Sequence, residues 1–210
     1  MNILSLNPYQ LAFIIVVPII VLAVLFFFIF LPLKKRIMRK KYDEYYYRTI
    51  RKIATNEDYY LINRFIFKID DTHTGKIDHI LFGDKYMYVI TDKYYNGDIM
   101  GNQFDKSLIL VNPKKGKSYV NNPCIETKTL LERLSLTTDV DKELMIGIVL
   151  TNRNVNIHVK NESKQYYLIQ VNKLPQLIKA IESRDIPTIN EQQLARAVNV
   201  FDKLNRRRDK

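Results

Sequence analysis

The first 33 residues contain no charged side chain, and residues 11–33 form an apolar run of 23 residues interrupted only by Pro18 and Pro32. About 20 helical residues span the roughly 30 Å of hydrocarbon in a bilayer, so this run predicts a transmembrane helix. Proline is tolerated there because neighbouring groups satisfy the backbone carbonyl that loses its partner. A cleaved signal peptide would have a basic start, a shorter apolar stretch and small residues before the cleavage site, and this sequence has none of them.

Six cations follow the apolar run directly and predict its orientation. Positive charge beside a spanning helix is retained in the cytoplasm, so residues 1–10 are expected to be a short extracytoplasmic tail and the rest of the chain to be cytoplasmic. Each basic residue near an anionic surface contributes about 1 kcal/mol, which makes membrane lipid the first expected partner. The predicted membrane-surface residues are Lys34, Lys35, Arg36, Arg39, Lys40 and Lys41. The sequence therefore predicts a single-pass protein of the cell membrane.

The net charge of +11 is concentrated at two places. Residues 34–41 carry six of these charges and residues 206–210 carry three, which leaves two for residues 42–205. A nearly neutral domain gives little general support for a nucleic-acid partner, although a local basic face stays open. Cys124 is the single cysteine, so no disulfide partner is expected, and the residue is expected to be a small buried side chain.

Alternating and apolar stretches predict an α/β domain of one sheet with helices packed on it. We expect a basic juxtamembrane segment and helix over residues 34–58, the α/β domain over residues 59–185, and a C-terminal helix with a basic tail over residues 186–210. Predicted strands cover 59–68, 76–82, 85–93, 107–111, 144–150 and 166–171, and predicted helices cover 42–54, 123–136, 174–183 and 189–205. A turn is expected at 113–116.

Asp78 lies within an apolar stretch, where a carboxylate is costly unless another group pairs with it. Five segments around it resemble, in order, the pattern of the nuclease-related domain family, NERD, a branch of the PD-(D/E)xK nuclease superfamily. They are Ile77-Asp78-His79-Ile80, the turn at Gly83, Val89-Ile90-Thr91-Asp92-Lys93, Gly97-Asp98-Ile99-Met100-Gly101 and Asn122-Pro123-Cys124-Ile125-Glu126. The resemblance covers about residues 42–182 and implies a restriction-endonuclease-like mixed sheet flanked by helices.

The resemblance also implies phosphodiester hydrolysis with Mg²⁺ held by two carboxylates beside a lysine. Oxygen ligands suit Mg²⁺, which polarises a phosphate and lowers the pKa of bound water. The implied catalytic residues are Asp78, Lys93 and Glu126, and the implied metal ligands are Asp78, Asp92 and Glu126. Mg²⁺ is expected as a cofactor only if this nuclease site is active.

The motif departs from the family at the position two before Lys93, where Thr91 replaces a carboxylate. Side chains alternate along a strand, so Asp92 is expected to face away from Lys93. Glu126 stands where the family has glutamine, and it could supply the second carboxylate from its helix. The leading hypothesis is a degenerate nuclease domain that binds nucleic acid or a protein partner at the membrane. The alternatives are an active Mg²⁺-dependent nuclease and a structural membrane adaptor.

Two further groups are expected to have structural roles. His79 lacks metal-ligand spacing and is expected to be a strand histidine with satisfied hydrogen bonds. The tyrosines of the juxtamembrane helix are expected to pack or to lie at the membrane interface, in preference to stacking on bases. They are Tyr42, Tyr45, Tyr46 and Tyr47.

Overall fold

The computed structural model describes residues 8–69, 72–138 and 140–205. The chain divides into two compact units, Met1–Glu44 and Tyr45–Lys210. The second unit contains the candidate site.

The N-terminal unit contains the apolar helix. Helix α1 (Pro8–Leu25) leads into a π-helical turn η2 (Phe26–Phe30) and then into α2 (Leu31–Asn56). None of the side chains of Phe13–Phe30 is buried, and Phe28 is 77% exposed. Pro32 has no N–H to donate to the carbonyl of Phe28, which accounts for irregular hydrogen bonding just before it. By length and composition this helix can cross a membrane.

Helix α1 begins at Pro8, within the predicted tail of residues 1–10. A proline at the first helical position has no N–H that the helix would need. Residues 1–7 lie outside the described residues, as does the predicted basic tail at 206–210.

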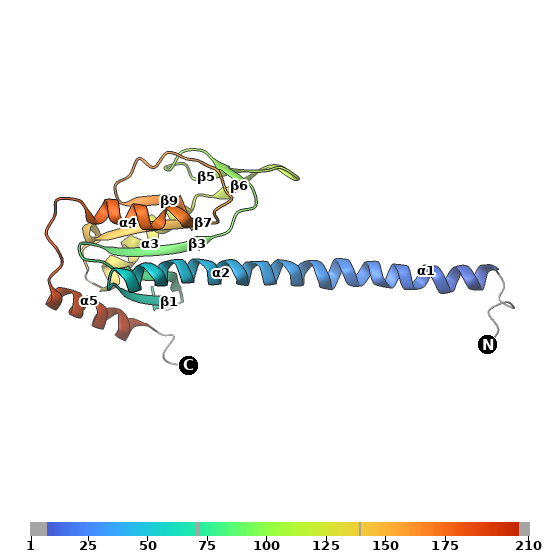
Figure 1. The fold of residues 1–210 in the computed structure, drawn as a ribbon, viewed down its shortest axis with the longest axis horizontal. Helices are drawn as coiled ribbons and strands as arrows, with labels where there is room; N and C mark the ends of the chain where they lie inside the picture. Colours follow the sequence, from blue (N-terminus) through green and yellow to red (C-terminus); the bar gives the residue numbers. More distant parts are fainter. Residues whose placement is uncertain (1–7, 70–71, 139, 206–210) are drawn as a thin grey trace. The chain divides into compact units, whose positions relative to one another are not determined.

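A mixed five-stranded sheet forms the centre of the second unit, in the order β1-β2-β3-β7-β9 (Figure 1). Strand β3 lies in the middle of the sheet, where it pairs antiparallel with β2 and parallel with β7. The strands are β1 (Tyr60–Lys68), β2 (Thr74–Phe82), β3 (Met87–Lys93), β7 (Met145–Thr151) and β9 (Tyr166–Gln170). Each of the five was predicted within three residues at its ends, because β-branched and aromatic residues dominate these segments.

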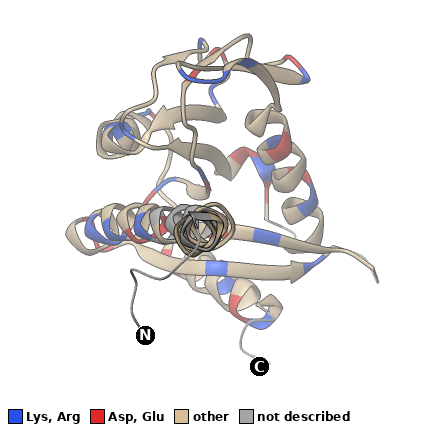
Figure 2. Cartoon of the chain, turned by 90° about the vertical axis from the view of Figure 1, so that its right-hand side faces the viewer, with Lys and Arg blue, Asp and Glu red and all other residues tan. Residues whose placement is uncertain are grey.

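Helices cover both faces of this sheet. Helix α3 (Pro123–Thr138) packs on β7 and β9, and α5 (Glu191–Leu204) packs on α3 and β1. Phe201 of α5 and Leu131 of α3 share one core cluster with Met87 and Val89 of β3. On the opposite face, Tyr88 contacts Glu182 at the end of α4 (Leu174–Glu182). Charges of both signs are spread over the domain (Figure 2), in agreement with its small net charge.

A second sheet of four strands has the order β6-β5-β4-β8. Its strands are β4 (Asp98–Met100), β5 (Ser107–Asn112), β6 (Gly116–Asn121) and β8 (Ile157–His158). The sequence predicted one sheet, so the division into two is a correction. Strands β4, β6 and β8 were not predicted, because β6 is largely polar and exposed and because β4 and β8 have only three and two residues.

Candidate functional site

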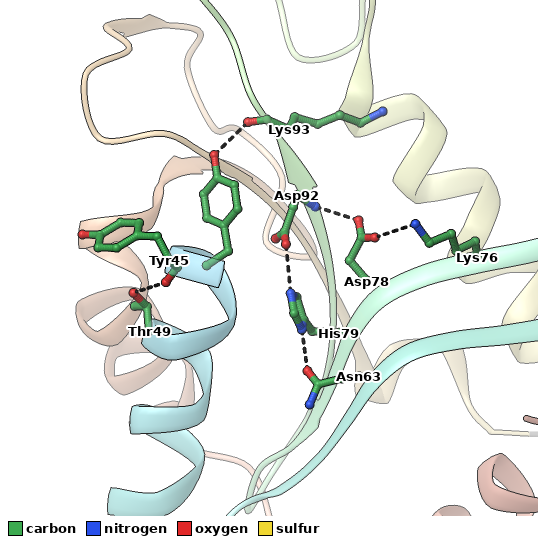
Figure 3. Close-up of polar contacts among 9 residues, drawn as sticks. Tyr45, Thr49, Asn63, Lys76, Asp78, His79, Asp92 and Lys93 are labelled. Carbon is green, nitrogen blue, oxygen red and sulfur yellow. Dashed lines mark hydrogen bonds and ion pairs between the residues drawn. The ribbon is translucent and has the colours of Figure 1, made fainter. Parts of the chain in front are cut away.

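The last three residues of β3 alternate between the two faces of the central sheet. The Thr91 hydroxyl lies 3.4 Å from that of Thr127 on α3, and Lys93 Nζ lies 2.7 Å from Glu126 Oε2 on the same helix. Asp92 points the other way and contacts His79 (Figure 3). Residues 91 and 93 therefore share the face covered by α3, while residue 92 belongs to the opposite face.

Asp78 lies where the β-ladders on both sides of β2 are interrupted. The pairing of β2 with β3 ends at His79 and Ile90, and beyond it the Asp92 N–H donates to Asp78 Oδ2 at 3.0 Å. On the other side, Arg64 opposite Asp78 has a positive φ of 54° and drops out of the β1–β2 register. The Asp78 carboxylate thus takes the place of a strand carbonyl, and the regular strand pairing is interrupted beside it.

The side chain of Asp78 is half-buried and has one cation beside it. Lys76 Nζ lies 3.4 Å from Asp78 Oδ1, and the Lys76 side chain is mostly exposed (Figure 3). A pair of this kind contributes little to stability, because water screens the exposed ammonium. The backbone N–H of Asp92 is therefore the contact that fixes the Asp78 carboxylate.

Behind Asp92 lies a buried polar chain. His79 Nε2 is 2.9 Å from Asp92 Oδ2, and His79 Nδ1 is 2.6 Å from Asn63 Oδ1 on β1. The side chains of His79 and Asp92 are only 6% and 11% exposed. His79 is thus a strand histidine with both ring nitrogens satisfied, as predicted, and its partners hold Asp92 on the face opposite Lys93.

The C-terminal turns of α2 contact the same strand from this side. The Tyr46 hydroxyl donates to the backbone carbonyl of Lys93 at 3.2 Å, and the Tyr47 ring stacks against His79 with centroids 6.4 Å apart. Tyr46 is almost completely buried and Tyr45 is exposed. The expectation that the tyrosines pack is therefore confirmed for Tyr46 and Tyr47.

The Asn122-Pro123 pair fixes the start of α3 and so the position of Glu126. Asn122 is buried, and its side-chain amide donates to the carbonyls of Gln103 and Asp105. Its Oδ1 accepts the Cys124 N–H at 3.0 Å, which caps the helix, and Glu126 follows in the first turn. A carboxylate is favourable there because of the helix dipole.

Burial shifts the pKa values of two groups near the start of α3. Burial raises the pKa of the Tyr95 hydroxyl, and the negative charge of Glu126 raises it further. Burial also raises the pKa of the Cys124 thiol to about 11. Cys124 is 3% exposed, so the prediction of a small buried side chain is confirmed.

The residues implied as metal ligands have separate partners. Asp78 contacts Lys76 and the Asp92 N–H, Asp92 contacts His79, and Glu126 contacts Lys93. Across residues 8–69, 72–138 and 140–205, no three or more His, Cys, Asp or Glu side chains form a group that could hold a metal ion. This arrangement does not fit the implied Mg²⁺ site, so no catalytic step through a metal follows from it.

The predicted membrane-surface residues all lie on α2. The side chains of Lys34, Lys35, Arg36, Arg39 and Lys40 are outside the described set, and Lys41 is exposed. Sequence reasoning missed the contacts of Asn63, Tyr46 and Thr127 with the site, since each comes from an element distant in sequence.

Asp78 lies in the middle of β2 and Lys93 at the end of the neighbouring β3, in a mixed sheet covered by helices. Together with the family match that follows, this arrangement is a nuclease-like α/β domain. The family model for the nuclease-related domain, NERD, matches residues 41–152, or 112 of the 210 residues. The chain therefore belongs to this family, and the predicted resemblance is confirmed.

Comparison with solved structures adds little. A crystal structure of a protein of unknown function, AF1548, is similar over 74% of this chain and 78% of that one, with 11% identity and a TM-score of 0.33. No curated protein sequence matches the chain.

Proposed function

We propose that this chain is a membrane-anchored member of the NERD family whose domain binds nucleic acid at the cytoplasmic face without efficient hydrolysis. The observation that carries the proposal is the side chain at position 91. Thr91 faces α3, beside Lys93, and contacts Thr127 instead of supplying the family's carboxylate. A neutral hydroxyl binds a hard divalent cation much less strongly than a carboxylate does.

The remaining carboxylate on the α3 face supports the same reading. Glu126 forms an ion pair with Lys93, which occupies the group that would orient or activate water. Asp92 would have to turn through the sheet to reach this face, and its contact with buried His79 opposes that movement. The chain keeps the family fold, while Glu126, Lys93 and Asp92 contact other side chains of the protein.

An active nuclease is the second candidate, and the position of Glu126 favours it. A carboxylate 2.7 Å from Lys93 could replace the missing one if the ion pair opened to admit a metal ion. In this alternative Asp78 and Glu126 would be the acidic residues and Lys93 the cation at the reacting phosphate.

One assay separates the two candidates. Purified full-length chain in detergent micelles is incubated with linear, circular and single-stranded DNA and with RNA, in Mg²⁺ or Mn²⁺, and binding is measured on the same substrates. We expect binding without cutting. Metal-dependent cutting that is lost in both Asp78→Ala and Lys93→Ala would instead support the nuclease and overturn the proposal.

The anchor and its orientation are part of the proposal. An apolar helix able to cross a bilayer and the six cations of residues 34–41 support a single span with the N-terminus outside. Protease added to inside-out vesicles should then remove the domain, whereas protease added to intact cells should leave it whole. The opposite pattern would reverse the orientation, and release of the chain by a carbonate wash would remove the anchor from the proposal.

A further inference from the structure

The outer face of the β6-β5-β4-β8 sheet carries a row of four side chains, of which three are exposed and Ile109 is half-buried. Tyr119 lies opposite Ile109, Ile109 opposite Met100, and Met100 beside His158, so the four side chains cross the sheet from edge to edge. Tyr119 is 81% exposed and Met100 is 41% exposed. An aromatic ring this open on a sheet surface contributes little to folding and leaves its face available to a ligand.

The other face of the same sheet has the opposite character. Ile99 and Leu108 are fully buried there in a core cluster that also contains Cys124 and Val149. The exposed row is therefore a property of one face and does not come from general looseness of the small sheet.

The hairpin of β5 and β6, which carries Tyr119, is also locally basic. Residues 106–125 contain four lysines and no acidic residue, in a domain whose net charge is close to zero. The four are Lys106, Lys114, Lys115 and Lys117. All four are exposed, and Lys117 lies two residues from Tyr119, on the same side of β6. Lys114 and Lys115 lie in the turn that joins β5 to β6, so three of the four lysines lie close to Tyr119 along the chain.

We propose that this face, centred on Tyr119 and Lys117, is a binding platform for single-stranded nucleic acid. An exposed aromatic ring stacks on a base only when the base is unpaired, and lysines beside it bind the phosphates. The inference rests on the proposed function and names its substrate class as single strands in preference to duplex.

Charge and continuity indicate where the strand would run. Asp98 lies on β4, and its carboxylate accepts the Asn156 N–H at 3.1 Å. Hydrogen bonds from the side chain and the backbone of Asn156 lower the pKa of Asp98, so a negative charge stays at that side and phosphates are favoured along β5 and β6. Strand β6 ends five residues before Glu126, and β4 begins five residues after Lys93. The platform is thus joined to the candidate site by two short segments.

The test measures fluorescence anisotropy of labelled oligothymidine with the full chain in detergent micelles over a series of salt concentrations. Tyr119→Ala should weaken binding about tenfold, whereas Tyr119→Phe, which keeps the ring, should bind like the parent chain. Lys117→Gln should reduce the slope of log Kobs against log salt by about 0.7, the value for one phosphate contact with a single strand.

Matched controls come from the α3 and α4 helices. Leu136→Ala removes a side chain that is 88% exposed on α3, and Lys179→Gln removes an exposed charge on α4. Both should bind like the parent chain. If Tyr119→Ala behaves like Leu136→Ala, or if duplex binds more tightly than oligothymidine, the platform is wrong while the proposed function stands. If the parent chain binds no nucleic acid at all, both proposals fail.

Discussion

Replacing His79 tests whether the buried chain behind the site is structural. His79→Ala removes the contact to Asp92 at 2.9 Å and the contact to Asn63 at 2.6 Å, and leaves the Asp92 carboxylate in a position that is 11% exposed. Removing the hydrogen-bond partner of a buried group costs about 1–3 kcal/mol, and the cost is larger when the group left behind is charged. We take about 3 kcal/mol, because Asp92 is a carboxylate with little contact with water.

This loss of stability corresponds to a fall in the melting temperature, Tm. For a domain of this size, 1 kcal/mol corresponds to about 2–4 °C, so His79→Ala should lower Tm by about 6–12 °C. The chain has 14 tyrosines and no tryptophan, so near-UV circular dichroism of tyrosine reports the packed domain. The full chain would be heated in detergent micelles, with reversibility checked by cooling.

The control for His79 is the other histidine on a strand. His158 is exposed on β8, and His158→Ala should change the free energy of unfolding by less than about 0.5 kcal/mol. A double-mutant cycle with Asp92→Ala should recover part of the loss, because it removes the carboxylate that His79→Ala leaves buried. If His79→Ala melts like His158→Ala, or if the two changes simply add, the pairing argument is refuted.

Three further predictions concern single contacts. The side chains of Lys93 and Glu126 are 38% and 47% exposed, so Glu126→Gln should shift Tm by less than about 3 °C, and a larger fall would contradict a solvent-screened pair. Asp58 follows the end of α2 with a φ of 56°, and the next residue, Tyr59, donates its N–H to the Ala54 carbonyl, so Asp58→Gly should raise stability by about 0.5 kcal/mol. Because burial raises the Cys124 pKa to about 11, the thiol should resist maleimide at pH 8 and react after urea unfolding.

The sequence predicted the central sheet better than the second one. The strands β2, β3 and β7 carry runs of buried aliphatic and aromatic residues, which are unambiguous signals. Strand β6 alternates lysine, serine and tyrosine with little burial, and a turn was expected where it begins. Its pairing with β5 is decided by the Pro113–Gly116 turn and by backbone hydrogen bonds, which leave no apolar pattern in the sequence.

At the site, alternation along one strand was enough to predict that Asp92 and Lys93 face opposite ways. The partners of these residues could not be predicted, because they come from other elements. Tyr46, which bonds to the Lys93 carbonyl, precedes it by 47 residues, and the break beside Asp78 depends on the positive φ of Arg64 on the neighbouring strand. Such contacts are fixed by tertiary packing and have no local signature.

A one-residue displacement of an acid along β3 changes the face on which it acts. An acid at position 91 would lie beside Lys93, whereas Asp92 is held by His79. Thr91→Glu should therefore create Mg²⁺ binding, measured by calorimetry, and Mg²⁺-dependent cutting of DNA that is lost again on adding Asp78→Ala. Thr91→Gln, of the same size without the charge, should do neither. If folded Thr91→Glu binds no Mg²⁺, the missing carboxylate is not what separates this domain from a nuclease. The distance between Asp78 and the new carboxylate at position 91 would then be the reason that no metal binds.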